Sequence, residues 1–245
     1  MPSHDHNKEV VAQWDHMHRY SPAPRHRRKI ILNFLKTIQF NDCLDAGCAQ
    51  GYLLDEIAKR FNIRGHGCDI SSKVIEENMN RFPHLSFHVL DVEKEVLNHK
   101  QFDVVISSEV IEHIHDWKGA IHHLTQMTKK YLIITLPAGK VRAIDKKVGH
   151  HRHYDKTLKH EIERYGFLCD ELQHGFPIHS LYKRLINFRP EQTFAAFSGK
   201  KSYSLFKIIF SQIIYYLFYI DYLFKHGEQV FIFAKRIDHH ETSTI

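Results

Sequence analysis

One stretch of the sequence decides the fold of this chain: Leu44-Asp45-Ala46-Gly47-Cys48-Ala49-Gln50-Gly51-Tyr52. An apolar run, 42–46, leads into a turn with two glycines, and an amphipathic segment, 52–61, follows. Gly47 lets the backbone turn sharply and lets a ligand approach where a Cβ atom would clash, while Gly51 permits close packing of the next element. The stretch therefore predicts a strand, a ligand-binding turn and a helix whose N-terminus offers unpaired N–H groups.

The same alternation of apolar runs and amphipathic segments continues outward from this turn. Strands are expected at 42–46, 63–68, 85–90, 102–107, 131–136, 166–172 and 228–235, and helices at 52–61, after Ser71 or Ser72, at 116–128 and at 155–165. Continuous apolar strands between helices indicate a parallel sheet covered on both faces. The expected fold class is α/β.

Composition excludes several classes of protein. With 245 residues, 43% of them hydrophobic and 25% charged, the chain is neither disordered, collagen-like nor a coiled coil as a whole. Its four cysteines form no CxxC pair, which argues against a disulfide framework and a structural zinc site. The net charge of +6 suggests an anionic partner, but no long basic tail points to nucleic acid. The polar segment 1–20 lacks the apolar core of a signal peptide, so a cytoplasmic location is expected.

Three acidic residues follow the strands at a spacing that suits an adenosine-containing ligand. Asp69 ends the second strand, where a carboxylate can accept both ribose hydroxyls. Asp91 ends the third, where it can accept from the adenine amine while Val92 packs on the ring. Asp45 would repel a pyrophosphate but suits a cationic amino group. The rival enzyme interpretation, a nicotinamide dehydrogenase, needs a neutral glycine turn, and Asp45 and Gln50 argue against it.

Taken together, these features resemble the class I S-adenosylmethionine-dependent methyltransferases. The resemblance covers 42–167 and the last strand at 228–235. Asp45-x-Gly47-x-x-x-Gly51 matches the first motif of the family, with Ala49 where many members have glycine. The segment 102–113, FDVVISSEVIEH, resembles the fourth strand and its continuation.

The resemblance implies a Rossmann-like seven-stranded sheet with an antiparallel last strand, a helical N-terminal cap and a helical insert before that strand. It implies S-adenosylmethionine as the cofactor. The expected cofactor-binding residues are Tyr20, Arg25, Asp45, Ala46, Gly47, Cys48, Gly51, Tyr52, Asp69, Ile70, Asp91, Val92, Ser108 and Glu109.

Four regions are expected along the chain: a helical cap at 1–40, the methyltransferase domain at 41–173 and 227–237, a helical insert at 174–226, and a disordered tail at 238–245. The cap is expected to hold two helices broken at Ser21-Pro22-Ala23-Pro24. In similar enzymes such a cap closes over the cofactor, and Tyr20 or Arg25 would meet the methionine carboxylate. Surface packing of the cap, with Trp14 among its residues, is the alternative.

Candidate catalytic residues follow the fourth and fifth strands. Glu109, Glu112 and His113 have spacings that would place them on one helical face. His113 and His151, which lies in the loop 149–154, are the expected general bases. No metal is expected, although Glu109, Glu112, His113 and a loop histidine would suit a divalent ion. In a third interpretation these residues only cap helices and hold the loop.

The expected function is S-adenosylmethionine-dependent methylation of a small-molecule or lipid-like acceptor. The motif after the fourth strand also occurs in the ubiquinone-biosynthesis O-methyltransferases, which the chain resembles. One alternative is a metal-assisted RNA 2′-O-methyltransferase, because the small-RNA 3′-end enzymes hold a metal with two Glu and two His. Another is a catalytically silent cofactor-binding module. Neither the oligomeric state nor the acceptor is predicted.

The segment 204–225 is apolar nearly all round and approaches the roughly 20 residues needed to span a bilayer. A single crossing would leave the strand 228–235 on the wrong side, so a peripheral contact with an anionic membrane surface is expected instead. Basic residues flank the segment, at Lys200, Lys201, Lys207 and Lys225. A buried helix, a substrate lid or a dimer contact are the alternatives.

Overall fold

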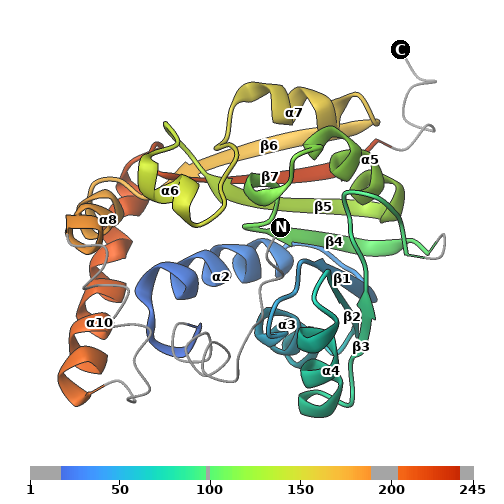
Figure 1. The fold of residues 1–245 in the computed structure, drawn as a ribbon, viewed down its shortest axis with the longest axis horizontal. Coiled ribbons are helices and arrows are strands. Elements are labelled where there is room, and N and C mark those ends of the chain that lie inside the picture. The colour runs from blue at the N-terminus through green and yellow to red at the C-terminus, as the bar shows by residue number, and fades with distance from the viewer. Residues whose placement is uncertain (1–17, 98–99, 189–203, 238–245) are drawn as a thin grey trace. The chain divides into compact units, whose positions relative to one another are not determined.

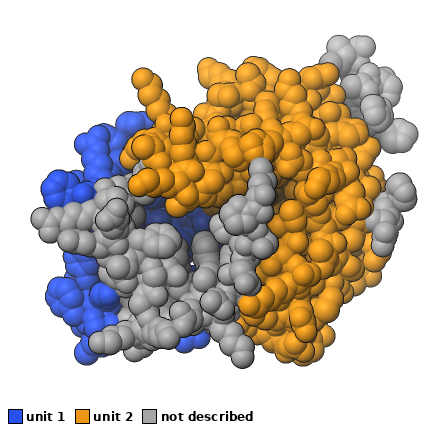
Figure 2. Space-filling view, viewed as in Figure 1, with its two compact units in different colours: residues 1–39, 174–228 blue, residues 40–173, 229–245 orange. Residues whose placement is uncertain are grey.

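The structure, a computed structural model, describes residues 18–97, 100–188 and 204–237. The expectations for Trp14, for Lys200 and Lys201 and for the tail 238–245 lie outside these residues. The chain divides into two compact units, which Figure 2 distinguishes by colour. Unit 1 comprises residues 1–39 and 174–228, and unit 2 comprises residues 40–173 and 229–245.

Unit 2 is built on one seven-stranded sheet with the order β3-β2-β1-β4-β5-β7-β6 (Figure 1). The strands are β1 (Asp42–Ala46), β2 (Arg64–Asp69), β3 (Ser86–Val89), β4 (Phe102–Ser108), β5 (Thr128–Pro137), β6 (Phe167–His174) and β7 (Gln229–Arg236). The pairs β1–β2, β1–β4, β2–β3 and β4–β5 are parallel, whereas β7 runs antiparallel to β5. The predicted fold class and the antiparallel last strand are confirmed.

Helices cover both faces of this sheet. They are α3 (Tyr52–Phe61), α4 (Ser72–Arg81), α5 (Trp117–Met127), α6 (Ala143–Lys147) and α7 (Lys156–Glu163), with a 3-10 turn, η1 (Ile111–His113). Side chains of α3 and α4 form one apolar cluster with β3, and side chains of α5 and α7 form a larger one with the central strands. Side chains alternate along a strand, so β1, which is fully buried, and β4, which is buried except at Ser108, can supply both faces.

The element boundaries follow local signals in the sequence. Ser71 is the N-cap of α4, and its hydroxyl accepts from the Val74 N–H at 3.4 Å. The expected strand at 131–136 is longer than predicted, since β5 begins at Thr128 and includes Pro137, which pairs with Gln229. Most other strands and helices differ from prediction by one or two residues, and the short helix α6 was not predicted.

Unit 1 is helical where it is described. It contains α2 (Pro22–Leu35), α8 (Ile178–Phe188), α10 (Leu205–Leu217) and a 3-10 turn, η2 (Phe218–Leu223). The expected helix break at 21–24 is confirmed at Ser21, which separates the helical residues 18–20 from α2, and Pro22 begins α2 with Pro24 in its first turn. Proline suits that position, since the first N–H groups of a helix have no partner within it. Helix α10 packs against α2, and η2 against α8.

Candidate active site

The turn between β1 and α3 has the left-handed backbone that its glycines predict. Gly47 has φ +80° and Gly51 has φ +73°. A Cβ atom on Gly47 would lie 2.3 Å from Cγ2 of Val110, so the position tolerates no side chain. The N–H groups of Gly47 and Cys48 both donate to the carbonyl of Cys68, at 2.8 and 2.9 Å. These bonds fasten the turn to the end of β2.

Ala49 takes up a left-handed conformation with φ +43°. Alanine is small enough to fit this turn, so the cost of having no glycine here comes from the backbone conformation. An L-residue in this region costs on the order of 1–2 kcal/mol. The turn compensates with two hydrogen bonds at Ala49: its N–H donates to Asp69 at 3.1 Å, and its carbonyl accepts from Asn78 at 2.6 Å. Asn78 is 1% exposed and was not identified from the sequence.

Two carboxylates end neighbouring parallel strands beside this turn. Asp45, on β1, is 3% exposed, and burial together with the negative charge of Asp69 raises its pKa to about 7. Asp69, on β2, accepts from the Ala49 N–H and from the Ser71 N–H at 3.0 Å. Asp69 therefore also orders the turn. Next to it, the side chain of Ile70 is 69% exposed and open to a ligand.

The remaining predicted cofactor residues of unit 2 lie around the same strand ends. Asp91 follows β3, where its carboxylate accepts from the Glu93 N–H at 3.0 Å and pairs with Lys94 at 2.8 Å. Val92 is 7% exposed and belongs to the large apolar cluster. The Tyr52 hydroxyl accepts from Arg81 at 2.8 Å. Ala46 and Cys48 are buried, on and directly after β1.

Glu109 does not share a face with Glu112 and His113, so that expectation is wrong. Its backbone is left-handed, with φ +59°, and the residues after it form the 3-10 turn η1 instead of an α-helix. The Glu109 carboxylate accepts from Thr135 on β5 at 3.3 Å and from Gln229 on β7 at 3.1 Å. The Ser108 and Thr135 hydroxyls lie 2.9 Å apart. Three adjacent strands thus meet at one carboxylate, and sequence spacing gave no sign of Thr135 or Gln229.

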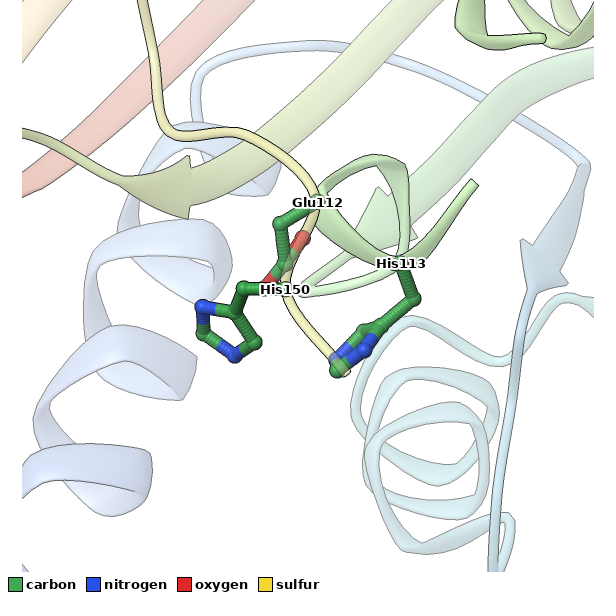
Figure 3. Close-up of side chains that lie close together, drawn as sticks. All are labelled: Glu112, His113 and His150. Atoms are coloured by element: carbon green, nitrogen blue, oxygen red, sulfur yellow. The ribbon is translucent and has the colours of Figure 1, made fainter. Parts of the chain in front are cut away.

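A cluster of ionisable side chains forms where η1 meets the loop after α6. Figure 3 shows Glu112 and His113 from η1 beside His150 from that loop. The rings of His113 and His150 lie 4.8 Å apart, edge to face. The potential ligand atoms of the three residues all lie within 4.8 Å of one another, so this group has the donor types and spacing of a divalent-cation site.

A second group of the same kind shares His150. Nδ1 of His150 lies 3.2 Å from Nε2 of His153, which is 3.8 Å from a carboxylate oxygen of Asp145. Nδ1 of His153 lies 3.2 Å from the carbonyl oxygen of Gly139. Burial and the nearby histidines lower the pKa of His150 to about 4, so its ring is neutral at pH 7. The alternative set for a divalent ion included Glu109, which belongs to neither of these two groups of described residues. Oε1 of Glu109 accepts from Thr135 and Gln229 instead.

The loop 149–154 is fastened to η1 by several hydrogen bonds. The Gly149 carbonyl lies 3.2 Å from Nδ1 of His113, and the His151 N–H donates to the Glu112 carbonyl at 2.7 Å. Arg152 donates to two carbonyls of the segment after η1, those of Ile114 and His115. These bonds fit the interpretation in which the residues hold the loop. They do not test the general-base role of His113 and His151, which stays a prediction.

The two predicted cofactor residues of unit 1 make contacts within that unit. The Tyr20 carbonyl accepts from the Ser211 hydroxyl of α10. Arg25 donates to Gln212 at 2.9 Å and lies over the ring of Tyr215, 4.1 Å from its centroid. Their contact with the cofactor stays a prediction.

Comparisons with known proteins agree with this geometry. A family model described as "Methyltransferase domain" matches residues 15–188, more than half of the chain. Two curated proteins also match, and the chain covers only 2% of the length of one and 38% of the length of the other.

Three solved structures have the same fold. Phosphoethanolamine N-methyltransferase 2 of Haemonchus contortus, with phosphomonomethylethanolamine and S-adenosylhomocysteine, is 16% identical with a TM-score of 0.65, over 95% of this chain and 59% of that one. N-methyltransferase NodS of Bradyrhizobium japonicum WM9, with S-adenosylhomocysteine, is 13% identical with a TM-score of 0.58, over 95% and 100%. Magnesium protoporphyrin IX methyltransferase of Synechocystis PCC 6803, also with S-adenosylhomocysteine, is 16% identical with a TM-score of 0.58, over 95% and 96%.

Proposed function

We propose that this chain, which belongs to the methyltransferase domain family, binds S-adenosylmethionine and transfers its methyl group to a small-molecule acceptor. One observation carries the proposal. The Gly47 turn, the buried Asp45 and the Asp69 carboxylate meet at the carboxyl ends of β1 and β2. Ligands of open α/β sheets bind at this edge.

The residues at this edge fit the chemical groups of the cofactor. A buried carboxylate whose pKa is raised, as at Asp45, is stabilised by a cationic amino group such as that of the methionine moiety. Asp69 would accept from the ribose hydroxyls and Asp91 from the adenine amine, with Ile70 against the base. S-adenosylmethionine supplies an activated methyl group, so the protein has to align the acceptor and, for a hydroxyl acceptor, remove a proton.

His113 and His151 are our candidates for the group that removes this proton. Both side chains are exposed, and they come from the two segments joined by the loop contacts. Partial desolvation, His115 and the cationic Arg152 lower the pKa of His151, which favours the neutral ring that can accept a proton. General-base catalysis needs this protonation state.

Within the small molecules, we propose an oxygen acceptor of the lipid-like kind used by the ubiquinone-biosynthesis enzymes, which the segment 102–113 resembles. Two of the three similar structures belong to enzymes whose names give a small-molecule substrate, phosphoethanolamine and magnesium protoporphyrin IX. The position of the Glu109 carboxylate is unfavourable to a four-ligand RNA methyltransferase site.

Calorimetry tests the cofactor part of the proposal. Asp69→Ala should weaken S-adenosylmethionine binding by about 1–3 kcal/mol, since it removes acceptors from hydrogen-bonding groups. Asp170→Ala, at an exposed position on β6, is the matched control and should leave the affinity unchanged. Circular dichroism checks that both variants fold. Unchanged affinity in a folded Asp69→Ala protein would remove Asp69 from the site.

Mass spectrometry of cell extracts incubated with the enzyme and isotope-labelled S-adenosylmethionine tests the acceptor class. We expect label in small or lipid-like molecules, on oxygen. Label confined to RNA would favour the metal-assisted alternative. Cofactor binding without labelled product would favour a silent binding module.

A further inference from the structure

Helix α10 is apolar over most of its length, yet the side chain that it buries is polar. Among residues 205–217 only Ser211 is buried, and its hydroxyl donates to the Tyr20 carbonyl just before α2. The neighbouring Gln212 accepts from Arg25 of α2 at 2.9 Å. In a helix of a water-soluble domain the apolar side packs inward and the polar side faces water. Helix α10 has the opposite arrangement.

About half of the side chains of α10 are apolar and exposed, whereas Tyr215 packs on α2. Six of them are each at least 50% exposed: Leu205, Phe206, Ile209, Phe210, Ile213 and Tyr216. Their spacing places most of them along one stripe of the helix. The exposed apolar surface continues on η2, where Leu223 is 79% exposed, and α8 of the same unit exposes Leu181, Leu185 and Phe188. Large exposed patches of this kind mark interaction surfaces.

The exposed charged side chains on these elements are all basic. Within 178–188 and 204–226, the exposed charged side chains are Arg184, Lys207 and Lys225. Lys183 is half-buried and pairs with Glu228 at 3.6 Å. The one acidic residue in these segments, Asp221, is fully buried.

Asp221 is engaged inside unit 1. Its carboxylate accepts from the Ile178 N–H at 2.8 Å and from the His179 N–H at 3.0 Å, at the start of α8. The one acidic side chain of 178–188 and 204–226 is therefore absent from the apolar surface, where basic side chains are exposed. Exposed apolar and aromatic side chains with basic residues are the combination that binds the headgroup boundary of an anionic bilayer.

We infer that the outer face of α8, α10 and η2 is a membrane-binding surface that attaches this protein peripherally to an anionic lipid bilayer. By length and composition, 205–223 is long enough to cross a membrane, and 17% of it is buried. A single crossing conflicts with topology, because β6 and β7, on either side of the insert, belong to the same sheet. The polar contacts of Ser211 and Gln212 keep one side of α10 on α2, so the helix lies in the interface with its other side in the lipid.

Vesicle flotation of the full chain tests the inference without using methyl transfer. The protein should float with phosphatidylcholine vesicles that contain phosphatidylglycerol, and this binding should weaken in high salt. The double variant Phe206→Ser/Ile213→Ser should bind at least about tenfold more weakly, because it removes two apolar anchors. Leu168→Ser, at an apolar position on β6 that is 64% exposed, is the matched control and should bind like the wild type.

The charge contribution has its own pair of variants. Lys207→Gln should weaken binding by about fivefold at low salt, and Lys156→Gln, at an exposed position of α7, should not. Failure of the wild type to float with anionic vesicles at low salt would overturn the inference. A second result would also overturn it: the wild type does not float but forms a dimer, and Phe206→Ser/Ile213→Ser breaks that dimer. A second copy of the chain would then cover this face. Cofactor binding, measured separately, distinguishes either failure from failure of the proposed function.

Discussion

Helix α10 of unit 1 places its apolar side chains differently from the core elements of unit 2. In unit 2, Leu54 of α3 and Phe231 of β7 are fully buried, and polar groups face outward. In unit 1, α10 buries Ser211 and leaves Phe206 77% exposed. Both arrangements satisfy the same physics, since apolar groups avoid water and buried polar groups find hydrogen-bond partners. This difference is the observation on which the proposed membrane-binding surface rests.

Asp45 of unit 2 and His26 of unit 1 are both buried, but burial shifts their pKa values in opposite directions. In unit 2, burial raises the pKa of Asp45 to about 7, so its stabilising effect is complete below about pH 4 and is lost as the pH rises through 7. In unit 1, burial and His174 lower the pKa of His26 to about 3, and the two rings stack with centroids 5.0 Å apart. The contribution of the neutral His26 ring to stability is complete above about pH 6.5 and is lost as the pH falls toward 3.

The largest expected effect separates the two kinds of apolar side chain. Phe231→Ala should lower the free energy of unfolding by about 3–5 kcal/mol, because it opens a cavity in the core of unit 2. Phe206→Ala should change it by less than about 0.5 kcal/mol, because that ring is mostly in solvent. Urea denaturation followed by circular dichroism measures both. Equal losses would mean that Phe206 is part of a core, and the contrast between the units would disappear.

The next effect probes the polar interior of unit 1. Asp221→Ala should cost about 1–3 kcal/mol of unfolding free energy, because two N–H groups at the start of α8 lose their acceptor. The control is Asp170→Ala on the surface of unit 2, for which we expect almost no change. Urea denaturation is again the measurement, and a neutral Asp221→Ala variant would contradict the assignment of Asp221 as a structural carboxylate.

A third test uses the raised pKa of Asp45. Below about pH 7 its carboxyl is protonated, and a cationic amino group has to displace that proton on binding. The affinity for S-adenosylmethionine should therefore increase about tenfold per pH unit up to about pH 7 and then level off. Isothermal calorimetry between about pH 5.5 and 7 follows this change. The Asp45→Asn variant should show a flat profile, and a flat wild-type profile would exclude Asp45 as the partner of the amine.

The smallest expected effect concerns how α2 is held within unit 1. Nζ of Lys29 lies 3.9 Å from the ring centroid of Tyr219, a cation–π geometry. Lys29→Met should cost about 0.5–1 kcal/mol of unfolding free energy. Lys129→Met, at an exposed position of β5, should cost nothing measurable. A difference between these variants in thermal unfolding would show that polar contacts contribute to the stability of unit 1, whereas identical curves would assign its stability to other groups.

The sequence alone was sufficient for the seven strands, for most of the helices between them and for the glycine turn. These features depend on local physics. The period of apolar residues identifies a strand or a helix, and the left-handed φ values of Gly47 and Gly51 follow from a turn between β1 and α3. The acid at the end of β2, Asp69, was located for the same reason, because parallel strands bring their carboxyl ends to one edge.

The hydrogen-bond partners of Glu109 and the buried side of α10 could be learned only from the tertiary structure. Glu109 appeared to belong with Glu112, three residues away, but its carboxylate is held by Gln229, 120 positions along the chain. The composition of 205–217 indicated an apolar helix and could not tell which side it buries, because that depends on the polar groups that α2 presents to it. Local pattern fixes the type of an element through its own backbone, whereas the partners of a side chain depend on residues that only folding brings near.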